Sequence, residues 1–88
     1  MNDLLAEAER ELAAKPRSQI EEETAFKWAA RAAVAYRLFR ETRMHQWLRD
    51  SADYYHEAIE HAALADHSGE VLRALREWIH HYIPRGVI

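Results

Sequence analysis

The side chains best suited to chemistry are six histidines, all of which lie in the second half of the 88-residue chain. Two of them follow a carboxylate by three positions, in the pairs Asp53 with His56 and Glu77 with His80. Residues three apart on a helix lie side by side, so each pair would offer a carboxylate oxygen and an imidazole nitrogen to one metal ion. The spacing therefore raises the hypothesis of a metal site.

The same spacing is similar to the Glu-x-x-His element of ferritin-like di-iron carboxylate bundles, which use it twice with two further glutamates. The stretches EEETAFKW and EAIEHAA also resemble the pattern of the small encapsulated ferritins. The position three before His61 departs from that pattern, because it is Ala58 and not a glutamate. The resemblance implies an oligomer that builds its metal site between subunits, from Glu57, His61, Glu77 or His80.

Helical phase gives a simpler interpretation of these residues. Neither carboxylate–histidine pair points toward the apolar seam of its own helix, whereas a site inside a bundle needs inward ligands. Glu57 and His61 are four apart, which is the spacing of an ordinary exposed pair on a helix. We therefore predict no cofactor and keep metal binding as an alternative function.

Nucleophilic catalysis has little support in the sequence. The chain has no cysteine, its serines are Ser18, Ser51 and Ser68, and it has no glycine-rich phosphate loop. No triad can be assembled from these residues, because a nucleophile needs a base and an orienting group beside it. We predict that the chain is not an enzyme.

The middle of the chain is basic, and the segments on either side of it are net acidic. Its cations are interleaved with aromatic residues, which raises nucleic-acid binding as a second alternative. The acidic flanks weaken attraction to phosphate, and arginine is also enriched at protein interfaces, so we rank a protein partner above nucleic acid. The basic block comprises Lys27, Arg31, Arg37, Arg40, Arg43 and Arg49.

The element that must position these groups is the stretch from Ala25 to Phe39, in which nothing breaks a helix. At about 100° per residue, one face of that helix is apolar throughout and is predicted to be core. It carries Ala25, Trp28, Ala29, Ala32, Ala35, Tyr36 and Phe39. The opposite side mixes apolar residues with cations and is predicted to make a second contact, through Ile20, Lys27, Arg31, Val34 and Leu38.

Four helices are expected along the chain. The first is short, begins after Asn2 or Asp3 and ends near Ala14, before Pro16. Ser18 then begins a capping box, Ser-Gln-Ile-Glu, that starts the second helix. The second helix runs through Phe39, and we place a turn at residues 42–45, with one unbroken helix through Leu64 as the alternative.

The third helix shows a heptad-like seam of Leu48, Ala52, Tyr55, Ile59 and Ala62. Its other side is acidic and offers a surface complementary to the cations, through Asp50, Asp53, Glu57 and Glu60. The stretch 51–58 also resembles the second helix of a tetratricopeptide repeat, but this likeness covers one helix and implies no binding residues here.

The fourth helix is expected from about Glu70 to Ile83, after a loop at residues 66–69 in which Gly69 permits a positive φ. Asp66 or Ser68 would cap it, and Pro84 and Gly86 would end it. Its predicted buried residues are Val71, Leu75, Trp78 and Tyr82, with Leu72 and Ile79 beside them.

The length and composition favour one all-α domain over residues 1–88, a small helical bundle. No stretch approaches the ~20 apolar residues of a membrane span, so we expect a soluble cytoplasmic protein with no membrane contact. The doubly apolar second helix, the three tryptophans and the segregated charge favour an interaction or regulatory module. We expect this module to self-associate as a homodimer or small homo-oligomer, or to bind another protein.

Overall fold

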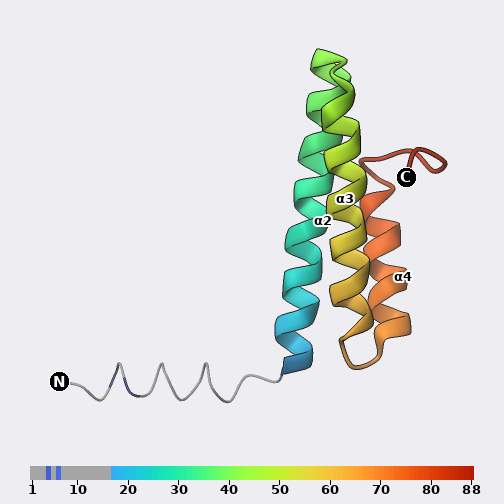
Figure 1. Cartoon of the computed structure of the whole chain (residues 1–88). Helices are drawn as coiled ribbons and strands as arrows, with labels where there is room; N and C mark the ends of the chain where they lie inside the picture. Colours follow the sequence, from blue (N-terminus) through green and yellow to red (C-terminus); the bar gives the residue numbers. More distant parts are fainter. Residues whose placement is uncertain (1–3, 5, 7–16) are drawn as a thin grey trace.

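The computed structural model describes residues 4, 6 and 17–88, and within these it contains three α-helices and no strand. The helices are α2 (Arg17–Thr42), α3 (His45–Ala63) and α4 (Ser68–Ile79), as labelled in Figure 1. The all-α prediction is confirmed for this part of the chain. The short N-terminal helix predicted before Pro16 lies outside the described residues, apart from the helical backbone of Leu4 and Ala6.

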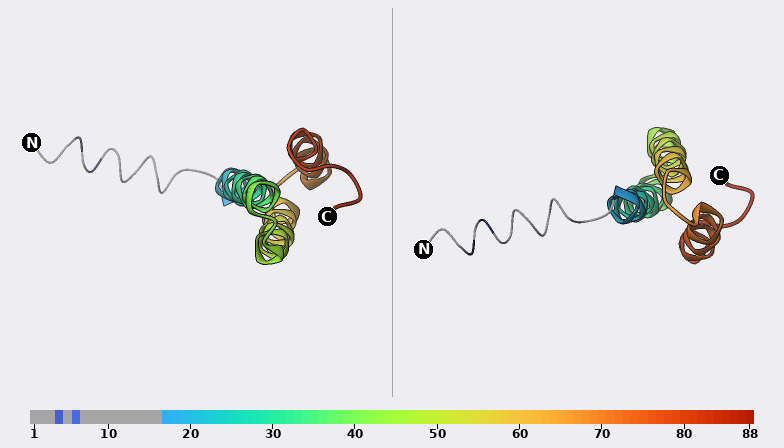
Figure 2. Two further views of the ribbon diagram at one scale, coloured as in Figure 1. Left: turned by 90° about the horizontal axis from the view of Figure 1, so that it is seen from above. Right: turned by 90° about the horizontal axis from the view of Figure 1, so that it is seen from below.

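α2 and α3 run antiparallel along most of their length and form a hairpin (Figure 1). α4 is shorter and contacts both of these helices from one side of the hairpin, as the end-on views of Figure 2 show. After α4 the chain turns back, and Ile88 packs against the core. None of the described helices is long and apolar enough to cross a membrane.

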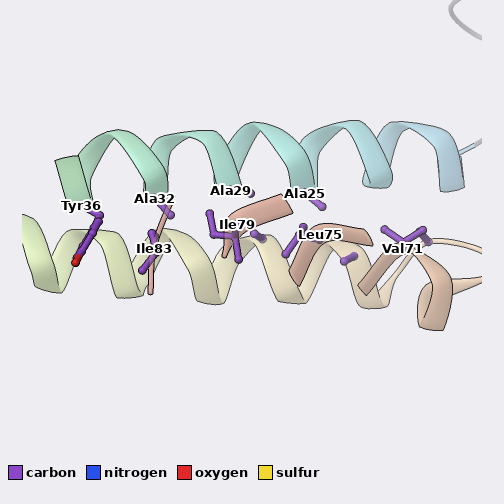
Figure 3. Close-up of a cluster of buried hydrophobic side chains, with 11 residues drawn as sticks. Ala25, Ala29, Ala32, Tyr36, Val71, Leu75, Ile79 and Ile83 are labelled. Atoms are coloured by element: carbon purple, nitrogen blue, oxygen red, sulfur yellow. The ribbon is translucent and has the colours of Figure 1, made fainter. Parts of the chain in front are cut away.

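The core lies where the three helices meet (Figure 3). α2 and α3 contribute mostly alanines there, which lets two helix axes come close, and α4 fills the remaining space with aliphatic side chains. The predicted core face of α2 is confirmed, because all seven of its residues are buried or half-buried. The fully buried members from the rest of the chain include Ala58 and Ala62 of α3, Leu75 and Ile79 of α4, and Ile83 just after α4.

The predicted break between the second and third helices is also confirmed. Arg43 adopts φ of 60°, and its N–H donates to the carbonyl of Phe39 at 2.7 Å. The Thr42 hydroxyl donates to the carbonyl of Leu38 at 2.7 Å and accepts the N–H of Met44 at 3.3 Å. A left-handed residue and a threonine side chain thus end α2 without the glycine that usually does so, and the unbroken-helix alternative is wrong.

Two predicted helix starts differ from the structure. Arg17 already belongs to α2, so the backbone of Ser18 lies inside the helix and is not its N-cap. At α4 the residue with positive φ is His67, at 56°, whereas Gly69 lies within the helix. The N-cap residue is His67, which makes no side-chain capping hydrogen bond, so the N-cap is neither Asp66 nor Ser68 as predicted. Histidine tolerates the left-handed region better than most residues, and composition alone does not show which residue will adopt it.

The end of α4 was predicted four residues too late, since the helix ends at Ile79. Its buried seam recurs every four residues through Ile79 and Ile83, and Tyr82 is 55% exposed although it was predicted to be buried. Trp78 is half-buried, and its ring lies 4.9 Å from that of Tyr82. The prediction for Tyr82 was wrong because aromatic and aliphatic residues alternate here, so the sequence offers two rows of apolar residues. The aliphatic row is buried because its smaller side chains fit against the alanines of α2 and α3.

Candidate interaction surface

The side of the α2–α3 hairpin away from α4 carries a shallow groove between the two helices. Its lining is apolar and aromatic except for one cation and comprises Ala30, Arg31, Val34, Ala35 and Leu38 of α2 with Trp47 and Tyr54 of α3. We call this side of the hairpin the open face, and define it by this groove together with Ile20, Lys27, Asp50 and Glu57 beside it.

Aromatic contacts hold the centre of the open face together. The rings of Trp28 on α2 and Tyr54 on α3 lie 5.7 Å apart, so they join the two helices. The guanidinium of Arg31 sits 4.7 Å from the centre of the Trp28 ring, within the range of a cation–π contact. Arg31 remains exposed, so its charge is fixed in place and still available to a partner.

The structure places the predicted residues of α2 on this face. Arg31, Val34 and Leu38 line the groove, and Val34 is 59% exposed although it is aliphatic. Ile20 is 44% exposed and lies on the same side of the helix by its spacing from Lys27 and Arg31. Lys27 is exposed and also lines a neighbouring groove with Phe26.

The predicted acidic stripe of α3 divides into two rows. Asp50 and Glu57 are half-buried and lie seven residues apart. Both are on the same side of α3 as Tyr54, whose ring contacts α2. Asp53 and Glu60 are exposed and lie about 60° further round the outer side of the helix, given about 100° per residue. The first row therefore borders the groove directly, and the second row lies at its outer edge.

His61 joins the C-terminal end of α3 to the N-terminal end of α2. Its Nδ1 lies 2.6 Å from Oε2 of Glu21, and its Nε2 lies 4.0 Å from Oε2 of Glu57. An ionised carboxylate only accepts hydrogen bonds, so the short contact requires Nδ1 to carry the hydrogen. The sequence indicated the pair with Glu57, but Glu21 is forty positions away, and only the antiparallel pairing of the helices brings it to His61.

The other residues of the metal hypothesis are not brought together. Asp53, His56 and Glu77 are exposed, and Nδ1 of His80 lies 3.0 Å from the carbonyl of Ile83. Over residues 4, 6 and 17–88, no group of three or more histidines and carboxylates is placed to hold a metal ion. A metal site would therefore need ligands from outside this part of one chain.

The basic block is divided between two sides of α2. Lys27 and Arg31 lie on the open face, whereas Arg37 and Arg40 line a different groove, beside Trp78 of α4. Arg37 also pairs with Glu41 at 3.2 Å, one turn along the helix. The cations do not form one continuous basic surface, which weakens the case for a nucleic-acid groove.

Ser51 was not singled out by the sequence as structurally important, yet it is fully buried between α2 and α3. Its hydroxyl donates to the carbonyl of Ala32 at 2.8 Å, so a small polar side chain links the hairpin at its middle. The small size of this serine in an alanine-rich sequence would have been the signal for a buried helix contact, since serine fits where larger residues cannot.

Comparisons with protein-family models, with curated proteins and with solved structures give no match for this chain.

Proposed function

We propose that the chain is a non-enzymatic protein-interaction module that self-associates through the open face. The observation that carries this proposal is the groove, where exposed aliphatic and half-buried aromatic side chains meet between a basic and an acidic border. An apolar centre with a charged rim is the usual anatomy of a protein interface. A cytoplasmic location is part of the proposal and rests on composition alone.

Arginine and aromatic residues further support a protein partner. Interface hot spots are enriched in tryptophan, tyrosine and arginine, and this face presents Trp47, Tyr54 and Arg31 within one groove. A regulatory role would follow if association controls access to this groove. The second partner class that fits the same face is a different protein with a matching apolar ridge.

The test is the double substitution Arg31→Glu with Val34→Glu. Both side chains are exposed, so the fold should remain intact while two acids enter the groove. We expect analytical ultracentrifugation to show loss of the oligomer and circular dichroism to show an unchanged helix content. The matched control is Arg73→Glu with Ala74→Glu on the exposed side of α4, which should leave association unchanged. Persistence of the oligomer in the first variant would contradict the proposal.

Metal binding by an oligomer is the second candidate. The observation that favours it is the position of Glu21 and Glu57 on either side of His61, because a second copy could add ligands to this group. It predicts metal in the purified protein, measured by elemental mass spectrometry, and loss of that metal on His61→Ala. Metal-free protein with an intact oligomer would contradict it.

A further inference from the structure

Four contacts show which residues of α2 and α3 lie side by side, that is, at the same height along the hairpin axis. Counting from the tip, they join Phe39 to His45, Ala32 to Ser51, Trp28 to Tyr54 and Glu21 to His61. Each step down α2 is matched by a nearly equal step down α3, as expected for two antiparallel helices rising about 1.5 Å per residue. The height of any residue on one helix can therefore be read on the other.

The open face places opposite charges at equal heights. Arg31 is next to Ala32, so it lies at the level between Asp50 and Asp53, which flank Ser51. Lys27 is next to Trp28 and so lies within about two residues, or about 3 Å, of the level of Glu57. The cations of α2 and the acids of α3 thus form two parallel columns on one face.

Apolar residues above and below the charged ones also match in height. Ile20 is next to Glu21, which puts it near the level of Leu64, a residue that is 61% exposed. Leu64 follows Glu57 by seven residues and so lies on the same side of α3. At the other end Leu38 is next to Phe39 and lies near the level of Trp47.

Two copies can meet on this face with two-fold symmetry in two simple ways. If the axis is perpendicular to the helices, α2 faces α2, and the cations of one copy approach those of the other. If the axis runs parallel to the helices, each residue lies at the same height as its counterpart in the other copy. In that arrangement α2 of each copy faces α3 of the other. Only the second arrangement sets opposite charges against each other, and like charges across an interface cost several kcal/mol.

We infer that two copies of this chain form a dimer in which the two α2–α3 hairpins pack face to face as four helices, with a two-fold axis that runs along the hairpins. Lys27 then faces Glu57 of the second copy, and Arg31 faces Asp50 and Asp53 of the second copy. Ile20 packs on Leu64 of the second copy. The same contacts occur twice, so the charge pattern of one face is complementary to itself. This inference rests on the proposed function and adds the arrangement of the subunits.

The experiment reverses the charges of each column and then of both. The first variant carries Lys27→Glu and Arg31→Glu, the second carries Asp50→Lys and Glu57→Lys, and the third carries all four. We expect each of the first two to raise the dimer dissociation constant by about 100-fold or more, measured by sedimentation equilibrium. Circular dichroism of every variant checks that the helices are kept.

The variant with all four substitutions provides the rescue. Its reversed columns again face each other in the parallel arrangement, so it should dimerise with itself within about tenfold of the native affinity. It should not pair with the unchanged chain, because like charges would then meet on both halves of the interface.

These experiments distinguish a failure of the proposed subunit arrangement from a failure of the proposed self-association. If the first two variants lose the dimer and the fourfold variant does not regain it, the parallel arrangement is overturned while self-association through the open face stands. If reversing the cations alone leaves the dimer unchanged, α2 does not face α3 of the second copy, and the arrangement is again overturned. A native chain that stays monomeric overturns both proposals.

Discussion

The two sides of the α2–α3 hairpin differ in what covers them. On one side α4 and the turn after it bury Leu75, Ile79 and Ile83 completely against the alanines of the hairpin. On the other side Val34 stays 59% exposed, and the half-buried rings of Trp47 and Tyr54 line an open groove. The hairpin thus presents apolar surface in two directions, and α4 covers only one of them.

The chemistry of the two sides explains why they are treated differently. The residues buried beneath α4 are apolar, so burying them permanently costs no desolvation of ions. The open side alternates apolar residues with charges, and a buried charge is tolerated only when it is paired. Such a surface is suited to reversible contact with a partner that supplies the pairing charges, as a second copy would in the proposed dimer.

The largest expected difference between the two sides is in stability. Leu75→Ala should lower the free energy of unfolding by about 2–5 kcal/mol, because it leaves a cavity beneath α4. Val34→Ala on the open side should change it by no more than about 0.5 kcal/mol, since this side chain is mostly in water. Urea denaturation at one low protein concentration measures both, so that association does not add to the apparent stability. Equal losses would mean that the open side is part of the core.

The hairpin that separates the two sides can be weakened at Ser51. Ser51→Ala removes the hydrogen bond to the carbonyl of Ala32 without adding bulk, and we expect a loss of about 1 kcal/mol. The matched control is Ser68→Ala in the first turn of α4, at a residue that is not the N-cap, with an expected change below about 0.5 kcal/mol. Thermal unfolding followed by circular dichroism compares the two, and a neutral Ser51→Ala would show that packing alone holds the hairpin.

The smallest effect is expected at the tip, where both sides end. Arg43→Gly should stabilise the chain by about 0.5–1 kcal/mol, because glycine adopts the φ of 60° found here without steric cost. The same substitution at the exposed Arg49, inside α3, should destabilise by about 1 kcal/mol. Chemical denaturation of the two variants should therefore give changes of opposite sign, and a shared sign would contradict the turn geometry.

Much of the fold follows from periodicity in the sequence. The core face of α2 and the break after Thr42 were predictable, because seven apolar residues share one phase and this register is lost beyond Arg40. Which residues are buried near the end of α4 was not predictable, because Tyr82 and Ile83 belong to two adjacent rows of apolar residues and either row could face the core. Only the space left by the alanines of α2 and α3 selects the aliphatic seam.

The candidate surface was predictable in part. The mixed stripe of α2 and the acids of α3 follow from helical phase within each helix. Their position on one face, and the groove formed with Trp47 and Tyr54, depend on how the helices pair. The contact between Glu21 and His61 depends on the same long-range pairing, which local spacing does not encode.

Native mass spectrometry of the untagged protein over a concentration series is the decisive test of self-association, because one spectrum reports both subunit number and bound mass. We expect a species with the mass of two chains and no added metal, which declines on dilution and is absent in Arg31→Glu with Val34→Glu. A single-chain mass at every concentration would contradict self-association. A larger assembly carrying stoichiometric metal would instead favour a site built between subunits around His61.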